Sequence, residues 1–144
     1  KNKSTNTLRR RSHEQLRGGK ADVVFGSKSY WEKRYQTQCS NMQPNNGSTL
    51  FEWYCGYSSL QGYVYEMLNI SQEFRGVHSD EKANVKILVI GCGNSKLSHD
   101  MHKDGFANTQ SMDYSEIVIK HMKKLYPHLA HTYHVENMLN ISLP

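Results

Sequence analysis

An apolar run followed at once by glycines, with an aspartate twenty residues past the second glycine, constrains the fold of this 144-residue chain most. Residues 85–90 (VKILVI) are apolar and β-branched, which predicts a buried strand of the kind found in parallel sheets. Gly91 and Gly93 then turn the chain, and glycines let the backbone approach a ligand closely because they lack a Cβ. A second expected strand, residues 107–112, leads directly into Asp113. The unit predicts a nucleotide-type ligand whose ribose hydroxyls donate to Asp113.

The glycine turn also narrows the choice of ligand. A dinucleotide-binding turn has a third glycine where this chain has Lys96, and the lysine-containing phosphate-binding loop is absent from the sequence. A shortened turn fits a ligand without a pyrophosphate, such as S-adenosylmethionine with its adenine, ribose and amino-acid tail. Glycines in a strand–turn–helix unit also occur for packing alone, so the turn by itself leaves that alternative open.

The part of the chain before this unit predicts helices and loops. Residues 24–36 are aromatic-rich and predict a short helix or ordered arm, and residues 39–48 predict a loop by their Pro, Asn and Gly content. Thr49 and Glu52 have the spacing of a capping box and begin an amphipathic stripe of apolar residues. These features predict a helix over residues 49–68.

The part that follows predicts alternating helices and strands. Residues 71–84 read as a polar connector to the first strand. The helix after the glycine turn is expected to end at Gly105, and the next helix to begin with Ser115 as its N-cap and to stop at Pro127. Residues 131–136 predict a third strand. This alternation predicts an α/β fold with parallel strands.

The net charge of +5 is concentrated in one segment of the chain. Residues 1–20 hold seven Lys or Arg and one acid, whereas the remainder holds 11 basic and 12 acidic residues. We therefore expect residues 1–22 to form a flexible basic tail and residues 23–144 to form the cofactor-binding part of the folded domain. A contact arm for RNA or for an acidic protein is the alternative interpretation of the tail.

Cysteine and histidine usage favours neither disulfides nor a metal. The chain has three scattered cysteines, Cys39, Cys55 and Cys92. They lack C-x-x-C spacing, which favours a reducing, cytoplasmic compartment. His131 and His134 would point to opposite faces of a strand, and no Cys or acid completes a ligand set with His99 and His102, so no metal site is expected. No run of eighteen apolar residues occurs, so no membrane contact is expected.

An aromatic cluster precedes the first expected strand. Its members are Tyr30, Trp31, Tyr35, Phe51, Trp53, Tyr54 and Tyr57. The sulfonium of S-adenosylmethionine is positive, and aromatic faces attract desolvated cations. The alternative is that these rings pack an N-terminal helix onto the sheet, which is the interpretation we prefer for Tyr54, Tyr57 and Tyr63.

Four segments of the sequence together resemble a known family. These segments read FGSKSYWEKRYQ, FEWYCGYSSL, ILVIGCGNSKLS and MDYSEIVIKHM. They are similar to segments of the methyltransferase-like proteins that methylate lysines of translation elongation factor 1A, and the resemblance runs from about Phe25 to the last residue. It implies a Rossmann-like class I methyltransferase fold with seven strands that binds S-adenosylmethionine.

The resemblance also implies the residues that contact the cofactor. They are Trp31, Tyr35, Trp53, Gly91, Gly93, Asp113, Tyr114, Asn137 and Met138. Trp31 and Tyr35 would cover the cofactor, Trp53 would lie near its methionine part, and Asp113 would bind the ribose. The family usually has Asp where this chain has Asn137 at the adenine edge. Its side-chain oxygen can still accept from the adenine amino group, without the benefit of a charged acceptor.

Proteins of this family continue past the ISLP that ends this sequence into a fourth strand with a D-K-G-T-L-D stretch and three further strands. We therefore expect a fold truncated after the third strand. The main hypothesis is an S-adenosylmethionine-dependent lysine methyltransferase acting on elongation factor 1A or a similar protein. Catalysis is expected to rest on positioning, with no general base identified. The alternatives are a methyltransferase for RNA or a small molecule, and a non-catalytic module that binds the cofactor or a partner.

Overall fold

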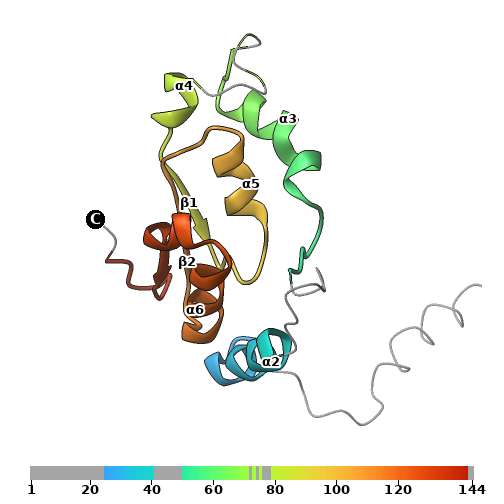
Figure 1. Cartoon of the computed structure of the whole chain (residues 1–144), viewed down its shortest axis with the longest axis vertical. Coiled ribbons are helices and arrows are strands. Elements are labelled where there is room, and N and C mark those ends of the chain that lie inside the picture. The colour runs from blue at the N-terminus through green and yellow to red at the C-terminus, as the bar shows by residue number, and fades with distance from the viewer. Residues whose placement is uncertain (1–24, 41–49, 72, 74, 76–78, 143–144) are drawn as a thin grey trace, which may run out of the picture.

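The computed structural model describes residues 25–40, 50–71, 73, 75 and 79–142 (Figure 1). The elements in chain order are α2 (Lys28–Ser40), α3 (Tyr57–Met67), α4 (Asp80–Ala83), β1 (Ile87–Ile90), α5 (Leu97–Lys103), β2 (Thr109–Asp113), α6 (Glu116–Leu125), the 3-10 helix η2 (Pro127–Thr132) and β3 (Tyr133–Val135). The expected tail over residues 1–22, the proposed cap Thr49 and most of the expected loop over residues 39–48 lie outside the described residues.

The three strands form one parallel sheet in the order β1-β2-β3. Val89 of β1 stands opposite Ser111 of β2, and Ser111 stands opposite Tyr133 of β3. Helix α5 connects the first pair of strands and α6 connects the second pair. This arrangement confirms the predicted α/β class with parallel strands, the arrangement that a Rossmann-like methyltransferase fold has at its start.

The helices that follow β1 and β2 lie on one face of this sheet (Figure 1). Crossovers between parallel strands are right-handed, and both crossovers here advance in the same direction, so α5 and α6 must cover the same face. On the opposite face Leu88 is 41% exposed and Ile90 is 51% exposed. Ile87 and Val89, on the covered face, are half-buried. The prediction of a buried first strand is therefore wrong for Leu88 and Ile90 and only partly met by the other two residues, because the described residues supply no helix to the second face.

Two apolar clusters hold the covered face. The first joins α2, α6 and η2 and contains Tyr35, Cys92, Val118, Ile119, Met122, Tyr126, Leu129 and Tyr133. The second joins α3 and α5 and contains Tyr57, Tyr65, Ile70, Met101 and Phe106. Val89 packs against both clusters, so the middle of β1 connects them.

The helix predicted over residues 49–68 begins at Tyr57 instead, with Gly56 as its N-cap. The reason is that Glu52 does not cap this helix. Its carboxylate accepts from the Ser95 hydroxyl (2.7 Å) and from the Lys96 N–H (2.6 Å) at the start of α5. The chain before α3 is thereby held in a non-helical path along α2 and the glycine turn, where Trp53 packs against Trp31.

Other helices and strands begin or end a few residues away from their predicted boundaries. Helix α2 continues through Ser40, so Cys39 lies in a helix and not in a loop. The expected connector over residues 71–84 contains the short helix α4, which Ser79 caps by accepting from the Lys82 N–H. The third strand is shorter than expected because η2 occupies the chain up to Thr132.

The predicted ends of α5 and α6 are confirmed. Gly105 follows α5 with a φ of 101°, a conformation that favours glycine. The Ser115 hydroxyl accepts from the Val118 N–H and caps α6, which ends at Leu125 before Pro127. No helix of the described residues is long and apolar enough to cross a membrane.

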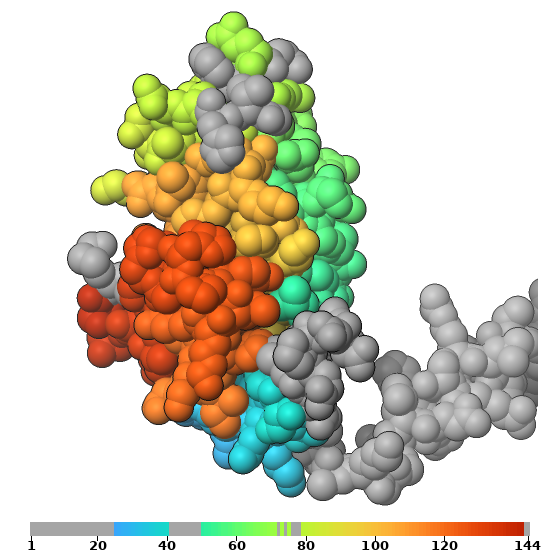
Figure 2. All heavy atoms as spheres, viewed as in Figure 1, coloured from blue at the N-terminus to red at the C-terminus, as the bar shows by residue number. Residues whose placement is uncertain are grey.

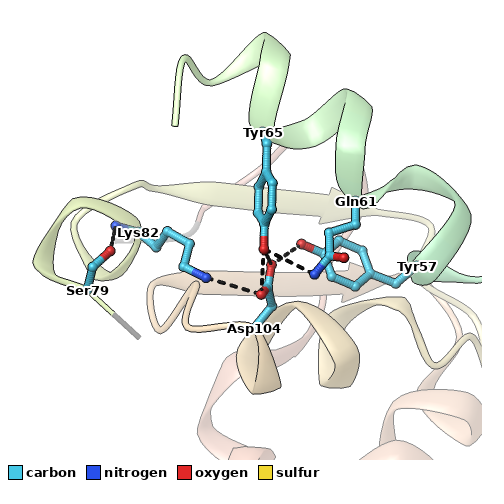
Figure 3. Close-up of polar contacts among 6 residues, drawn as sticks. All are labelled: Tyr57, Gln61, Tyr65, Ser79, Lys82 and Asp104. Carbon is cyan, nitrogen blue, oxygen red and sulfur yellow. Dashed lines mark hydrogen bonds and ion pairs between the residues drawn. The ribbon is translucent and has the colours of Figure 1, made fainter. Parts of the chain in front are cut away.

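A buried ion pair ties α3 and α4 to the end of α5 (Figure 3). The Lys82 ammonium donates to the Asp104 carboxylate at 3.1 Å, and the two side chains are 0% and 7% exposed. Tyr57 and Tyr65 of α3 donate their hydroxyls to the same carboxylate, at 2.6 and 2.7 Å. Burial alone would raise the pKa of Asp104, but the hydrogen bonds from Tyr57, Tyr65 and Lys82 together hold this pKa below its ordinary value.

Candidate cofactor site

A cavity of about 500 Å³ opens at the carboxyl ends of β1 and β2. In open α/β sheets, ligands bind at this end of the strands. Six of the nine predicted site residues line the cavity, namely Trp31, Gly91, Asp113, Tyr114, Asn137 and Met138. The other lining residues are Phe25, Gly26, Lys28, Ile90, Met112, Glu136 and Leu139. The cavity thus lies between α2, the two strand ends and the segment after β3.

The two glycines of the turn have different surroundings. Both have a positive φ, 65° at Gly91 and 51° at Gly93. A Cβ built on Gly91 would meet nothing within 4 Å, so the backbone there is open toward the cavity. A Cβ on Gly93 would lie 2.7 Å from the hydroxyl oxygen of Tyr35. Gly93 therefore gives Tyr35 room to pack on the turn and does not itself line the cavity.

Cys92, between the two glycines, is a packing residue. Its side chain is 5% exposed and belongs to the first apolar cluster. Burial raises the pKa of its thiol, with a further contribution from the negative charge of Asp113. A thiol held protonated in apolar surroundings is a poor nucleophile.

The Asp113 carboxylate joins the glycine turn after β1 to the turn after β2, at the edge of the cavity. One carboxylate oxygen accepts from the Gly93 N–H at 3.0 Å, and the other accepts from the Ser115 N–H at 2.9 Å. Burial raises the pKa of Asp113, and these two backbone donors partly offset that effect. Each carboxylate oxygen has a second lone pair, so the group can still accept from ligand hydroxyls in the cavity. Its neighbour Tyr114 donates its hydroxyl to the Ser27 carbonyl at 3.3 Å.

The aromatic residues of α2 and residues 50–53 form a connected group beside the cavity. Trp31 stacks on Tyr35 with ring centroids 5.8 Å apart, and Trp53 meets Trp31 edge-on at 5.8 Å. The Arg34 guanidinium lies 5.5 Å from the Trp31 ring and 5.2 Å from the Trp53 ring. Of these residues only Trp31 lines the cavity. Tyr35 is buried beneath it, where burial raises the pKa of its hydroxyl.

Trp53 lies away from the cavity lining and is 57% exposed. Its expected position near the methionine part of the cofactor remains a prediction. At the opposite end, Asn137 and Met138 line the cavity after β3, with Met138 64% exposed. The Asn137 side-chain oxygen accepts from the Leu139 N–H at 3.0 Å, which leaves its second lone pair for an adenine amino group.

Two carboxylates hold the aromatic group in place, and the sequence predicted this role for neither: no pattern singles out Glu32, and Glu52 was expected to cap a local helix. The Glu32 carboxylate accepts from the Ser115 hydroxyl (3.0 Å) and from the Glu116 N–H (3.1 Å) at the start of α6. Glu52 makes the matching pair of bonds at the start of α5. These contacts join residues 83 and 43 positions apart, and no local spacing signals them. Among the described residues, no group of three His, Cys, Asp or Glu side chains is placed to hold a metal.

No protein-family model matches the chain, but curated proteins do. It is 36% identical over 105 residues to the "eEF1A lysine and N-terminal methyltransferase" of Mus musculus, and equally to that of Homo sapiens. It is 31% identical over 100 residues to "EEF1A lysine methyltransferase 4" of Bos taurus. The matches cover 73% and 69% of this chain, but 12% and 31% of those relatives. The chain belongs to the methyltransferase-like family that includes these eEF1A lysine methyltransferases.

Proposed function

We propose that this chain provides the S-adenosylmethionine site of an enzyme that methylates lysine side chains of a protein, with elongation factor 1A as the substrate. The relatives are named as eEF1A lysine methyltransferases, which supports both the reaction and the substrate. One observation supports the proposal most strongly. The open turn at Gly91, the carboxylate of Asp113 and the indole of Trp31 all line one cavity at the strand ends.

The residues present fit this cofactor. Small-molecule sites commonly enclose about 300–1,000 Å³, and the cavity of about 500 Å³ falls within that range. Ile90, Met112 and Leu139 supply apolar surface suited to an adenine ring. Asp113 supplies acceptors for the ribose hydroxyls, and the indole of Trp31 supplies an aromatic face for a cationic sulfur.

When bound, S-adenosylmethionine supplies a methyl group activated by its sulfonium. The role of this chain is then to bind the cofactor and to orient it. Asp113 fixes the ribose, and Trp31, backed by the buried Tyr35, excludes water from one side of the cavity. A lysine nucleophile must be neutral, and desolvation favours the neutral amine. Alignment of reactants can account for a large part of such a rate enhancement, so no described residue is assigned as a general base.

A methyl-transfer assay with competing acceptors tests the proposal. The chain is incubated with S-adenosylmethionine carrying a tritiated methyl group and with either purified elongation factor 1A or total RNA. We expect label on the protein, mapped by mass spectrometry to a lysine, and none on RNA. Label on RNA alone would contradict the proposed acceptor, and no label on any acceptor would contradict transfer by this chain.

A further inference from the structure

Glu32 and Glu52 attach the N-terminal part of the fold to two turns beside the cavity. These are the glycine turn after β1 and the turn after β2 that begins at Asp113, and the two attachments are alike. At α6, one Glu32 oxygen accepts the Ser115 hydroxyl and the other accepts the N–H of the next residue, at 3.0 and 3.1 Å. At α5, one Glu52 oxygen accepts the Ser95 hydroxyl and the other accepts the N–H of the next residue, at 2.7 and 2.6 Å. Each carboxylate thus uses both oxygens, and hydrogen bonds to an ionised acceptor are among the strongest in proteins.

Each serine also turns inward to its own helix. The Ser115 oxygen accepts from the Val118 N–H at 3.3 Å, and the Ser95 oxygen accepts from the Leu97 N–H at 3.0 Å. A serine hydroxyl has one proton to donate, and here both serines donate it to a glutamate. The glutamate is therefore the acceptor that completes the hydrogen bonding of the serine at each turn.

The two attachment points coincide with the predicted cofactor contacts. Ser95 lies two residues after Gly93, and Ser115 lies two residues after Asp113. Gly93 and Asp113 are themselves joined by a hydrogen bond of 3.0 Å. A displacement of either attachment would consequently reach the backbone that surrounds the cavity.

The segments attached in this way carry Trp31, which lines the cavity, and Trp53, which packs against Trp31 from outside the lining. Glu32 lies in α2 next to Trp31, which lines the cavity, and α2 lies directly against α6 in the space-filling view (Figure 2). Glu52 lies next to Trp53, whose ring packs edge-on against Trp31. The Phe51 N–H donates to the Asn94 carbonyl at 3.1 Å and gives the second segment one further contact with the glycine turn.

We propose that Glu32 and Glu52 are positioning residues, two carboxylate latches that hold α2 and residues 50–53 against the glycine turn and the Asp113 turn, and so set the affinity for S-adenosylmethionine. Neither glutamate lines the cavity, so Glu32 acts through Trp31 and Glu52 acts through Trp53, which packs against Trp31. This role rests on the proposed function.

The test compares Glu32→Ala, Glu52→Ala and the double variant with the wild-type chain. Trp31 and Trp53 are the two tryptophans of the sequence and both lie in the latched segments, so tryptophan emission without cofactor reports the latches directly. We expect the emission maximum to shift to the red, most in the double variant. The dissociation constant for S-adenosylmethionine, measured by calorimetry, should rise roughly tenfold in each single variant, because bonds to a charged acceptor are lost.

A merely structural role would lower the thermal midpoint without changing the affinity of the folded chain. Titrations are therefore made at a temperature where circular dichroism shows every variant to be folded. Glu32→Gln and Glu52→Gln keep the length and one acceptor oxygen, so they should fall between wild type and alanine, and they keep the test open if an alanine variant does not fold. Glu116→Gln is the matched control. Glu116 also joins α2 to α6, through Lys28 at 3.4 Å, but its side chain is 74% exposed and should matter little.

Unchanged emission together with an affinity within about twofold of wild type in the double variant would overturn the latches. An equal loss of affinity in Glu116→Gln would also overturn them, since it would assign the effect to charge alone. Absence of cofactor binding by the wild-type chain would contradict the proposed function instead. The emission spectra, recorded without cofactor, would still confirm or overturn the attachment of the two segments.

Discussion

Gly91 and Gly93 show how one short motif serves two purposes at the residue scale. Both residues adopt the left-handed conformation, so replacing either one with a residue that has a side chain would strain the backbone. Only Gly93 also meets a neighbour, the Tyr35 hydroxyl. The sequence predicts that both positions require glycine, but it cannot separate the conformational reason from the steric one, because Tyr35 lies far away in the chain.

Alanine substitutions at the two glycines should therefore differ in their effect on stability. Gly91→Ala should cost about 1 kcal/mol for the positive φ alone. Gly93→Ala should cost about 1–2 kcal/mol more, because the new methyl group must displace a buried tyrosine. Urea unfolding followed by circular dichroism measures the difference. The double variant Tyr35→Phe with Gly93→Ala should recover most of that excess, and no recovery would show that the Tyr35 hydroxyl is not its cause.

At the scale of elements, the Lys82–Asp104 pair decides how α3 and α4 join the rest of the fold. The pair is buried, and two tyrosine hydroxyls complete the carboxylate's hydrogen bonds (Figure 3). Removing one member of such a pair leaves an uncompensated buried charge. The sequence shows no sign of this pair, because its partners come from three separate segments that only the tertiary structure brings together.

Asp104→Asn should destabilise the chain by about 3 kcal/mol and change how its stability depends on pH. The folded-state pKa of Asp104 lies below its ordinary value of 3.8. Its contribution is therefore present above that value and is lost as the pH falls through the lower folded-state pKa. Urea midpoints measured from pH 3 to 7 should accordingly fall more steeply at the acid end for wild type than for the variant.

Asp100→Asn is the matched control for this prediction. Asp100 lies within α5, one turn before Asp104, and pairs with Lys96 at 3.5 Å, but the Asp100 and Lys96 side chains are 26% and 48% exposed. Its loss should cost under about 0.5 kcal/mol. Equal costs for the two variants, or parallel pH profiles for wild type and Asp104→Asn, would refute the buried pair as the main connection.

Local signals predicted α6 well and α3 poorly, for a physical reason. Ser115 and Pro127 bound α6 through contacts within a few residues, so the sequence contains the information. Glu52 has the spacing of a local cap, but its carboxylate binds the start of α5 instead. A distant pair of donors outcompeted the local one, and capping spacing alone cannot reveal such competition.

At the scale of the whole molecule, the described fold has a sheet with one covered face. Val89 lies among both apolar clusters, whereas its neighbour Leu88 points to the other face and is 41% exposed. Apolar composition predicted the strand but not this sidedness, because an apolar run does not say which helices will cover each face.

Shortening the side chains of Val89 and Leu88 to alanine should change the free energy of unfolding by different amounts. Val89→Ala should cost about 1.5 kcal/mol, because it removes half-buried methyl groups that pack against both clusters and leaves a gap between them. Leu88→Ala should cost only about 0.5 kcal/mol, because much of that side chain already contacts water. Urea unfolding of both variants measures the contrast. A larger cost for Leu88→Ala would show that the second face is covered in solution.

The family motifs predicted part of the cavity lining. Trp31, Gly91 and Asp113 come from three distant segments, and the fold places all three around one space. Trp53 lies outside the lining, and the latching roles of Glu32 and Glu52 depend on long-range contacts that no motif encodes.

Calorimetric titration of S-adenosylmethionine into the wild-type chain tests whether the ends of β1 and β2 form a cofactor site, with Asp113→Asn as the site variant and Asp100→Asn as the control. We expect one bound cofactor per wild-type chain. Binding should be retained in Asp100→Asn and weakened at least tenfold in a folded Asp113→Asn chain, since a charged acceptor of the ribose is lost. Absence of binding by a folded wild-type chain, or equal binding by both variants, would contradict a cofactor site at the ends of β1 and β2.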